Sequence, residues 1–208
     1  MAETPNRWEG VYQSKEEAET SWFEDHPQVS LDLIAETGAG KDAAIVDVGA
    51  GSSRQVDCLL EQGFRRITVL DLSETALAKA RSRLPQDAPV EWVMANVLHW
   101  QPSGRFDVWH DRAAFHFLTE ASDQDAYLRV MDRALVPGGH AIIGTFASDG
   151  PTSCSGLPVA RYDAALLPER LGSAYRLVRS LSHEHRTPWG SVQRFQFGLF
   201  RKVCKRPG

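Results

Sequence analysis

Cysteine is scarce in this sequence: there are three in 208 residues, at Cys58, Cys154 and Cys204. Their wide and irregular spacing matches neither a zinc-binding motif nor the disulfide framework of a small secreted domain. Two histidines, His183 and His185, are two residues apart and would share one face of a strand, but the sequence offers no third ligand near them. We therefore expect no metal centre.

Long apolar runs and a strong net charge are also missing. No apolar stretch approaches the roughly 20 residues of a membrane-spanning helix, and residues 1–10 contain no apolar signal core. The formal net charge is −4, and one basic cluster, Arg201, Lys202, Lys205 and Arg206, is typical of a solvated strand end. These absences favour a cytoplasmic protein with no membrane or nucleic-acid partner.

What the sequence does contain is typical of a globular α/β domain. Its composition, 42% hydrophobic and 24% charged, suffices for one substantial core. From residue 43 onwards, short apolar runs alternate with segments of helical periodicity. Strands are expected at about 43–48, 66–71, 90–95, 106–110 and 140–146, and a hairpin at 175–183 and 192–203 around a turn at 188–190. Helices are expected at about 54–62, 74–84 and 163–171, and from a cap at Ser122 or Asp123 to residue 135.

This alternation predicts a Rossmann-like, doubly wound sheet of seven strands. The sheet is expected to be mostly parallel, because each strand is followed by a helix that returns the chain to the same edge. The closing hairpin adds an antiparallel strand at the C-terminal end.

Residues 1–42 precede the sheet and are unusually aromatic. Ser14 and Glu17 form a capping-box pattern that predicts a helix through Ser21, and residues 27–36 predict a second helix. The aromatic side chains of this arm are Trp8, Tyr12, Trp22 and Phe23. They either pack the arm onto the core or close it as a lid over a ligand, and the two interpretations are compatible.

The stretch AIVDVGAGSS at residues 44–53 begins as a buried parallel strand and ends as a glycine loop. Glycine permits a tight turn and lets a ligand approach the backbone closely. The helix predicted from Arg54 would present free backbone N–H groups to the same loop. We therefore expect a nucleotide-like ligand at the end of the first strand.

Polar side chains follow the next strands at the same edge. Asp71 lies about twenty residues after Gly51, the distance typical of an acid that binds ribose hydroxyls, and Ser73 caps the following helix. Asn96 follows the third strand, where its amide suits either an adenine edge or a plain turn. Four ionisable side chains lie at the end of the fourth strand: His110, Asp111, Arg112 and His116. The last three also have structural interpretations: an ion pair of Asp111 with Arg112, and a core position for His116.

The order of these motifs resembles the class I S-adenosylmethionine-dependent methyltransferases. The resemblance rests on Asp47-x-Gly49-x-Gly51, Asp71, Asn96-Val97, and Leu135-x-Pro137-Gly138-Gly139 before the fifth strand. It covers residues 43–208 and leaves residues 1–42 as a variable N-terminal arm or lid. A dinucleotide dehydrogenase would carry a third glycine or alanine where this chain has Ser52-Ser53-Arg54.

The resemblance implies S-adenosylmethionine as the cofactor. In that family the glycine loop and the first-strand acid hold the amino-acid part, the second-strand acid holds the ribose, and the next strand ends contact adenine. The residues implied here are Tyr12, Trp22, Asp47, Gly49, Ala50, Gly51, Ser52, Asp71, Leu72, Ser73, Asn96, Val97, Asp111 and Arg112. Asn96 departs from the aspartate that is common at its position and brings no charge.

The implied reaction is direct displacement, in which an acceptor nucleophile attacks the methyl carbon in line with the departing sulfur. His116 is the first candidate for a general base. On the acceptor side the sequence suggests Phe115, Cys154, Arg161 and Trp189.

No motif in the sequence identifies the acceptor or the oligomeric state. The aromatic arm and the loop at 147–161 favour a closed pocket for a small molecule with an O, N or S nucleophile. A protein-lysine methyltransferase, with an acidic groove from Asp111, Glu24 and Asp25, is the alternative. A non-catalytic partner that binds the cofactor is a third possibility of a different class.

Overall fold

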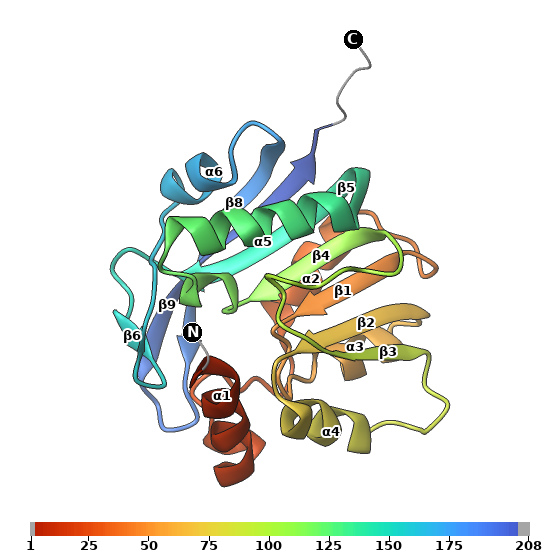
Figure 1. The fold of residues 1–208 in the computed structure, drawn as a ribbon, viewed down its shortest axis with the longest axis vertical. Coiled ribbons are helices and arrows are strands. Elements are labelled where there is room, and N and C mark those ends of the chain that lie inside the picture. The colour runs from red at the N-terminus through yellow and green to blue at the C-terminus, as the bar shows by residue number, and fades with distance from the viewer. Residues whose placement is uncertain (1–2, 204–208) are drawn as a thin grey trace.

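A seven-stranded sheet runs through the computed structural model, which describes residues 3–203 (Figure 1). Its order is β3-β2-β1-β4-β5-β9-β8, with parallel pairing from β3 to β5 and antiparallel pairing of β9 with both neighbours. The strands are β1 (Ala44–Val48), β2 (Arg66–Asp71), β3 (Val90–Met94), β4 (Phe106–Arg112), β5 (Leu135–Phe146), β8 (Tyr175–Arg186) and β9 (Val192–Lys202). The predicted fold class is confirmed.

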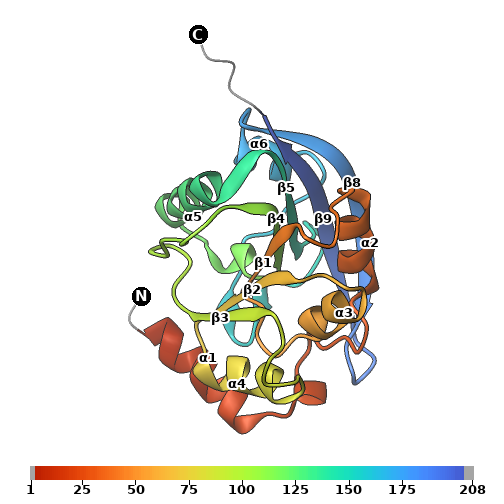
Figure 2. The same cartoon turned by 90° about the vertical axis from the view of Figure 1, so that its right-hand side faces the viewer.

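Helices cover both faces of this sheet (Figure 2). One face is covered by α5 (Ala121–Ala134) and α6 (Leu166–Leu171). The other is covered by α2 (Gln28–Glu36), α3 (Gln55–Glu61) and α4 (Glu74–Ser82). The remaining helical elements are α1 (Glu3–Ser14) and the short 3₁₀ turns η1 (Glu17–Glu19) and η2 (Phe115–Phe117). None of the helices within residues 3–203 has the length and apolarity needed to cross a membrane.

The core consists of two apolar layers, one on each face of the sheet. Successive side chains of a strand point to opposite faces, so β1 contributes to both layers. Val46 and Val48 pack with α5, whereas Ile45 packs with α2 and α3, and all three are at most 1% exposed. The continuous apolar run that predicted a buried strand is explained by this two-sided burial.

The N-terminal arm differs from its sequence-based prediction. The helix there is α1, which ends at Ser14 rather than beginning at it. The Ser14 hydroxyl donates to the Gly10 carbonyl at 2.8 Å, so it is occupied within the preceding helix and caps nothing that follows. A capping box does form, but between Glu16 and Glu19 at η1, where the Glu16 N–H donates to the Glu19 carboxylate at 2.9 Å.

Several boundaries further along the chain also differ, among them the end of β4, which extends to Arg112 rather than stopping at residue 110. Helix α5 begins after Glu120 without a side-chain cap, so neither Ser122 nor Asp123 caps it. Strand β5 starts directly at Leu135 and includes the Pro-Gly-Gly segment, which lies opposite an irregularity in β4. The predicted loop at 147–161 contains a small hairpin of β6 (Ser153–Cys154) and β7 (Leu157–Pro158). Cys204, Lys205 and Arg206 lie outside the described residues.

Candidate functional site

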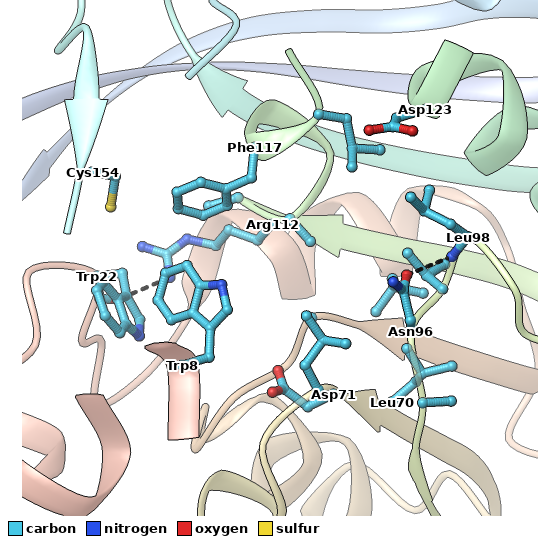
Figure 3. Close-up of a pocket in the computed structure, with 18 of the residues that line it drawn as sticks. Trp8, Trp22, Leu70, Asp71, Asn96, Leu98, Arg112, Phe117, Asp123 and Cys154 are labelled. Carbon is cyan, nitrogen blue, oxygen red and sulfur yellow. Dashed lines mark hydrogen bonds between the residues drawn. The ribbon is translucent and has the colours of Figure 1, made fainter. Parts of the chain in front are cut away.

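A pocket lies at the carboxyl ends of β1, β2, β3 and β4 and is closed on one side by α1 (Figure 3). This is the position where open α/β sheets bind ligands, since the chain leaves β1 and β4 in opposite directions there. The predicted site residues that line it are Tyr12, Trp22, Gly49, Asp71, Leu72, Asn96, Val97, Arg112 and Cys154. The structure adds residues that the sequence analysis did not assign: Trp8, Phe117, Leu118, Asp123, Phe146, Gln193 and Phe195.

The glycine loop after β1 adopts a conformation that only glycine accepts readily. Gly49 and Gly51 have φ angles of 64° and 59°, in the left-handed region. The Gly49 N–H donates to the Leu70 carbonyl at 2.8 Å, and the Gly51 N–H donates to the Asp71 carboxylate at 2.7 Å. A side chain at Gly49 would collide with Ala114, and one at Gly51 with the Tyr12 hydroxyl. The loop is therefore fixed to the end of β2.

Asp71 is the acid at the centre of this arrangement. One carboxylate oxygen accepts from the Gly51 N–H, and the other accepts from the Ser73 N–H at 2.8 Å. Burial raises the pKa of Asp71 to about 6, although these backbone hydrogen bonds act to lower it. Each oxygen keeps a lone pair, so the carboxylate can still accept hydrogen bonds from a ligand in the pocket.

The end of β3 forms an apolar slot beside Asp71. The Asn96 Oδ1 atom accepts from the Leu98 N–H at 2.9 Å, which makes a side-chain turn and leaves the amide N–H₂ group as a donor. Leu70, Leu72 and Val97 complete the lining. Figure 3 shows Asp71 and Asn96 on the same side of the pocket. This end suits a flat heterocycle attached to a hydroxylated ring.

The opposite end of the pocket is walled by aromatic side chains from several elements. The Trp8 ring lies 4.9 Å from the ring of Phe117 and 5.8 Å from that of Trp22, both edge to face. Phe146 and Phe195 line the same pocket. Such rings exclude water and present π-faces, which attract a cation.

Helix α1 is held over the pocket by polar contacts with α4. The Glu9 carboxylate accepts from the Ser73 hydroxyl at 2.7 Å, from the Thr75 N–H at 3.3 Å and from the Thr75 hydroxyl. These bonds lower the pKa of Glu9, and the positive end of α4 favours the same charge. Tyr12 lies one helical turn after Glu9 on α1 and is only 5% exposed.

A second set of contacts joins η1 to the glycine loop. The Arg83 guanidinium donates to the Ser53 carbonyl at 2.9 Å and the Ser52 carbonyl at 3.2 Å. It also pairs with Asp57 at 2.7 Å and with Glu17 of the arm. The arm and the loop are thereby coupled through one side chain.

Arg112 belongs to a third network, at the aromatic end. Its Nη1 donates to the Trp22 carbonyl at 2.9 Å, and its Nη2 lies 3.1 Å from the Glu24 carboxylate. Glu24 also contacts His185 Nδ1 at 3.1 Å, and His185 Nε2 contacts the Ser21 carbonyl at 2.7 Å. Burial acts to raise the pKa of Glu24, but the His185 hydrogen bond and the Arg112 charge lower it overall. Asp111 and Arg112 therefore do not pair with each other.

His116, the predicted base, does not line the pocket. Its side chain is 0% exposed, and its Nδ1 accepts from the Phe146 N–H at 3.3 Å. Burial, together with the Arg112 charge, lowers the pKa of His116 to about 3. This placement differs from the expectation that His116 faces the acceptor, because the 3₁₀ turn η2 directs the neighbouring Phe117 into the pocket instead.

Asp47, predicted to hold the amino-acid part of a cofactor, lies behind the pocket. Its carboxylate contacts His110 Nδ1 at 2.7 Å, and His110 Nε2 contacts the Ser30 hydroxyl at 2.8 Å. The order Ser-His-Asp is that of a hydrolytic triad, but all three residues are at most 3% exposed. No substrate can reach the buried Ser30 hydroxyl, so the three residues do not form a catalytic site. Their hydrogen bonds instead join α2 to β4 and β1.

Asp111 is likewise buried rather than facing the pocket. It accepts from the Tyr127 hydroxyl at 2.5 Å and from the N–H groups of Ala114 at 2.8 Å and Phe115 at 3.0 Å. The Tyr127 hydroxyl in turn accepts from the Trp109 Nε1–H at 2.8 Å. Burial raises the pKa of Asp111 to about 6. These bonds hold the turn that follows β4, and with it Arg112, in place.

The other predicted acceptor residues lie apart from the pocket, except Cys154. Phe115 is 0% exposed and its ring packs 4.9 Å from that of Tyr127. Arg161 is exposed and donates to the Gly150 carbonyl at 3.1 Å, and Trp189 is 59% exposed at the tip of the β8–β9 hairpin. Of the remaining predicted cofactor residues, Ala50, Gly51 and Ser52 form the loop beside the pocket and Ser73 caps α4. Within residues 3–203, no three His, Cys, Asp or Glu side chains form a metal-binding group.

Comparison with known proteins identifies the domain. Residues 45–139 match the family model described as a methyltransferase domain. The trans-aconitate 2-methyltransferase of Acidovorax sp. (strain JS42) is 32% identical over 116 residues, which are 55% of this chain and 43% of that protein. Nodulation protein S of Rhizobium tropici is 24% identical over 152 residues, 73% of this chain and 62% of its own length. The chain thus spans less than two thirds of the length of either relative.

Solved structures share the whole fold. The N-methyltransferase NodS from Bradyrhizobium japonicum WM9, in complex with S-adenosyl-l-homocysteine, superposes with a TM-score of 0.72 at 16% identity, over 94% of this chain and 98% of that one. The Burkholderia thailandensis 1,6-didemethyltoxoflavin-N1-methyltransferase gives 0.71 at 23% identity, over 98% and 85%. At these identities the likeness establishes the fold. Residues 45–139 match the methyltransferase domain family, and the strand order and the motifs at the strand ends are those expected of a class I S-adenosylmethionine-dependent methyltransferase.

Proposed function

We propose that this protein transfers a methyl group from S-adenosylmethionine to a nucleophilic atom of a small molecule. The observation that carries the proposal is the junction of Gly51 and Asp71, in which a ligand-accessible carboxylate is held by the glycine loop at the end of β2. The same pocket continues into an aromatic end closed by α1. One pocket therefore has room for a nucleoside at one end and for an acceptor at the other.

The residues present fit the proposed cofactor. Asp71 accepts hydrogen bonds from the ribose hydroxyls, and the slot of Leu72, Asn96 and Val97 receives the adenine. The cofactor supplies the electrophilic methyl group, bound to a sulfonium cation. Tyr12 and Trp22 offer π-faces to that cation, and they keep water from the methyl group.

Positioning is the chemical contribution that the chain makes in this proposal. Direct displacement needs the nucleophile, the methyl carbon and the sulfur in line, and a closed pocket restricts the acceptor to that approach. His116 has no place in the proposed mechanism, since it is fully buried and its pKa is lowered to about 3. The nucleophile therefore reaches the pocket either unprotonated or with its proton lost to solvent.

A small molecule fits this pocket better than a protein lysine does. A lysine acceptor calls for an open acidic groove, but Asp111 is buried and Glu24 is paired with Arg112. The relatives also support a small acceptor, because their names refer to trans-aconitate and to 1,6-didemethyltoxoflavin.

The proposal is tested by calorimetric titration of the purified protein with S-adenosylmethionine, S-adenosylhomocysteine and NAD. We expect binding of the first two and none of NAD, followed by transfer of labelled methyl in a screen of thiols, hydroxyls, amines and protein lysines. Binding of NAD alone would contradict the proposal. Tight cofactor binding without transfer to any acceptor would favour the non-catalytic partner instead.

Cofactor affinity is expected to depend on pH through Asp71. Ribose hydroxyls donate to the ionised carboxylate, and burial raises the pKa of Asp71 to about 6. Below that pH a growing fraction of Asp71 is protonated, and this fraction does not bind the ribose hydroxyls as the carboxylate does. The affinity for S-adenosylhomocysteine should therefore fall by about tenfold per pH unit below about pH 6 and should be constant above it. Titrations at pH 5, 6, 7 and 8 measure this, and a flat profile would remove Asp71 from the ribose site.

Removing the Glu9 contacts is expected to loosen the lid. In Glu9→Ala, α1 loses its three hydrogen bonds to Ser73 and Thr75, so S-adenosylhomocysteine should dissociate about tenfold faster. Stopped-flow displacement measures the rate. Glu61→Ala, an exposed acid on α3, is the matched control and should leave the rate unchanged. Equal rates in the two variants would mean that α1 does not act as a lid.

A further inference from the structure

Two side chains in the aromatic half of the pocket carry a buried polar atom that makes no hydrogen bond. They are Nη2 of Arg112 and Oε1 of Gln193. The Nη2 atom lies 3.1 Å from Glu24, within ion-pair distance but without hydrogen-bond geometry. Among the described residues that line the pocket, these two have such an atom. A buried polar atom without a hydrogen bond is costly, so each one points to a group that a ligand supplies.

Strand register places both side chains on one wall. Arg112 of β4 pairs with Gly144 of β5, and Gly144 pairs with Phe197 of β9. The Arg112 guanidinium lies 5.4 Å from the centre of the Phe195 ring. Gln193 precedes Phe195 by two residues and therefore shares its face of the strand. In Figure 3 the Arg112 side chain extends toward Trp22, away from the Asp71 and Asn96 end.

The rest of this wall is flat and apolar. The rings that line it are Trp8, Trp22, Phe117, Phe146 and Phe195. Aromatic walls favour a planar ligand, because stacked and edge-to-face contacts both bury its surface well. A flexible aliphatic acceptor would gain less from them.

The charges at this end are balanced. Arg112 faces Glu24, whose carboxylate also lies 3.1 Å from His185 and 3.9 Å from His183. Burial lowers the pKa of Arg112, whereas the charges of Glu24 and Asp47 act to raise it. The Arg112 charge is therefore already compensated, and a carboxylate ligand would meet Glu24 as a like charge. A neutral ligand group carries no such penalty.

We propose that the acceptor is a neutral, planar molecule carrying an amide or lactam group, bound by Arg112 and Gln193. Its carbonyl oxygen accepts from Arg112 Nη2, and its N–H donates to Gln193 Oε1. The role of this molecule as the methyl acceptor rests on the proposed function, but the binding site itself follows from the two atoms that make no hydrogen bond and from the aromatic walls. It distinguishes this chain from a protein that recognises a polycarboxylate.

The test uses the full chain and three matched two-ring probes. Isoquinolin-1(2H)-one presents both a carbonyl oxygen and an N–H. Its N-methyl derivative presents the oxygen alone, and naphthalene-1-carboxylate presents an anion. Binding of each is measured by calorimetry and by ligand-observed NMR, with and without saturating S-adenosylhomocysteine. We expect the lactam to bind about tenfold more tightly than either of the other probes.

A variant isolates the contribution of Gln193. Gln193→Leu keeps the size of the side chain but removes its amide, so the lactam should lose its advantage over the N-methyl probe, while S-adenosylhomocysteine binds as before. Gln101→Leu, at an exposed position outside the pocket, is the control and should keep that advantage. Circular dichroism verifies that both variants are folded.

The outcomes separate this inference from the proposed function. Tighter binding of the carboxylate, an unchanged lactam preference in Gln193→Leu, or failure of all three probes to bind would overturn the amide or lactam site. Failure of S-adenosylhomocysteine to bind would contradict the proposed methyl transfer. Lactam binding that depends on Gln193 without S-adenosylhomocysteine would still support the site.

Discussion

Gly51→Asp is expected to lower the affinity for S-adenosylhomocysteine by about a hundredfold or more. Gly51 has a φ of 59°, which costs an L-residue free energy, and a side chain there collides with the Tyr12 hydroxyl. The new carboxylate would also stand next to Asp71, which the Gly51 N–H now binds at 2.7 Å. Calorimetric titration of the folded variant measures the loss.

Gly63→Asp is the matched control for this experiment. Gly63 has a φ of 87°, so the backbone strain is similar, but nothing lies within 4 Å of the position of a side chain. This variant should lose stability and still bind S-adenosylhomocysteine normally. If Gly51→Asp folds and binds as well as Gly63→Asp does, the glycine loop is not the cofactor site.

Tyr127→Phe is expected to lower the free energy of unfolding by about 2–4 kcal/mol. The change removes one hydroxyl that donates to Asp111 at 2.5 Å and accepts from Trp109 at 2.8 Å. Both partners are 0% exposed, so water cannot replace the lost bonds. Urea unfolding monitored by tryptophan fluorescence and by circular dichroism measures the change.

Tyr162→Phe separates the hydrogen bonds of Tyr127 from the general loss of a hydroxyl. Tyr162 packs against Phe115 in the same core layer, and its hydroxyl makes no hydrogen bond with the described residues. Its replacement should change the stability by less than about 1 kcal/mol. Equal losses in the two variants would show that the Trp109–Tyr127–Asp111 contacts do not stabilise the fold.

The fold was predictable because its signals are local. Each parallel strand is buried on both faces and appears as an apolar run, and each helix shows its own periodicity. The β2 bounds, Arg66–Asp71, coincide with the prediction for this reason. The arm was less predictable, because Ser14 satisfies a capping pattern while its hydroxyl bonds to the preceding turn. The sequence pattern alone does not show whether a serine hydroxyl bonds to the preceding helical turn or caps the following one.

The site was predictable where the backbone itself makes it. Gly49, Gly51 and Asp71 lie at strand ends, and parallel strands bring their carboxyl ends to one edge whatever the side chains do. Side chains that reach the pocket from distant segments gave no such signal. Gln193 and Phe195 enter it because β9 runs antiparallel beside β5, a pairing that no local motif encodes.

The sequence by itself determined the order of the elements, the glycine loop and the acid that binds it. Only the tertiary structure decided which polar residues at the end of β4 and in the turn after it face the pocket. Asp111 and His116 have the chemistry of a site, but both are buried: Asp111 points to the face of β4 opposite to Arg112, and His116 is buried in η2, so that Arg112 and Phe117 line the pocket instead. The physical reason is that side-chain burial at the end of a strand and in the turn after it depends on long-range packing and buried hydrogen bonds, here those of Asp111 with Tyr127 and of His116 with the Phe146 N–H.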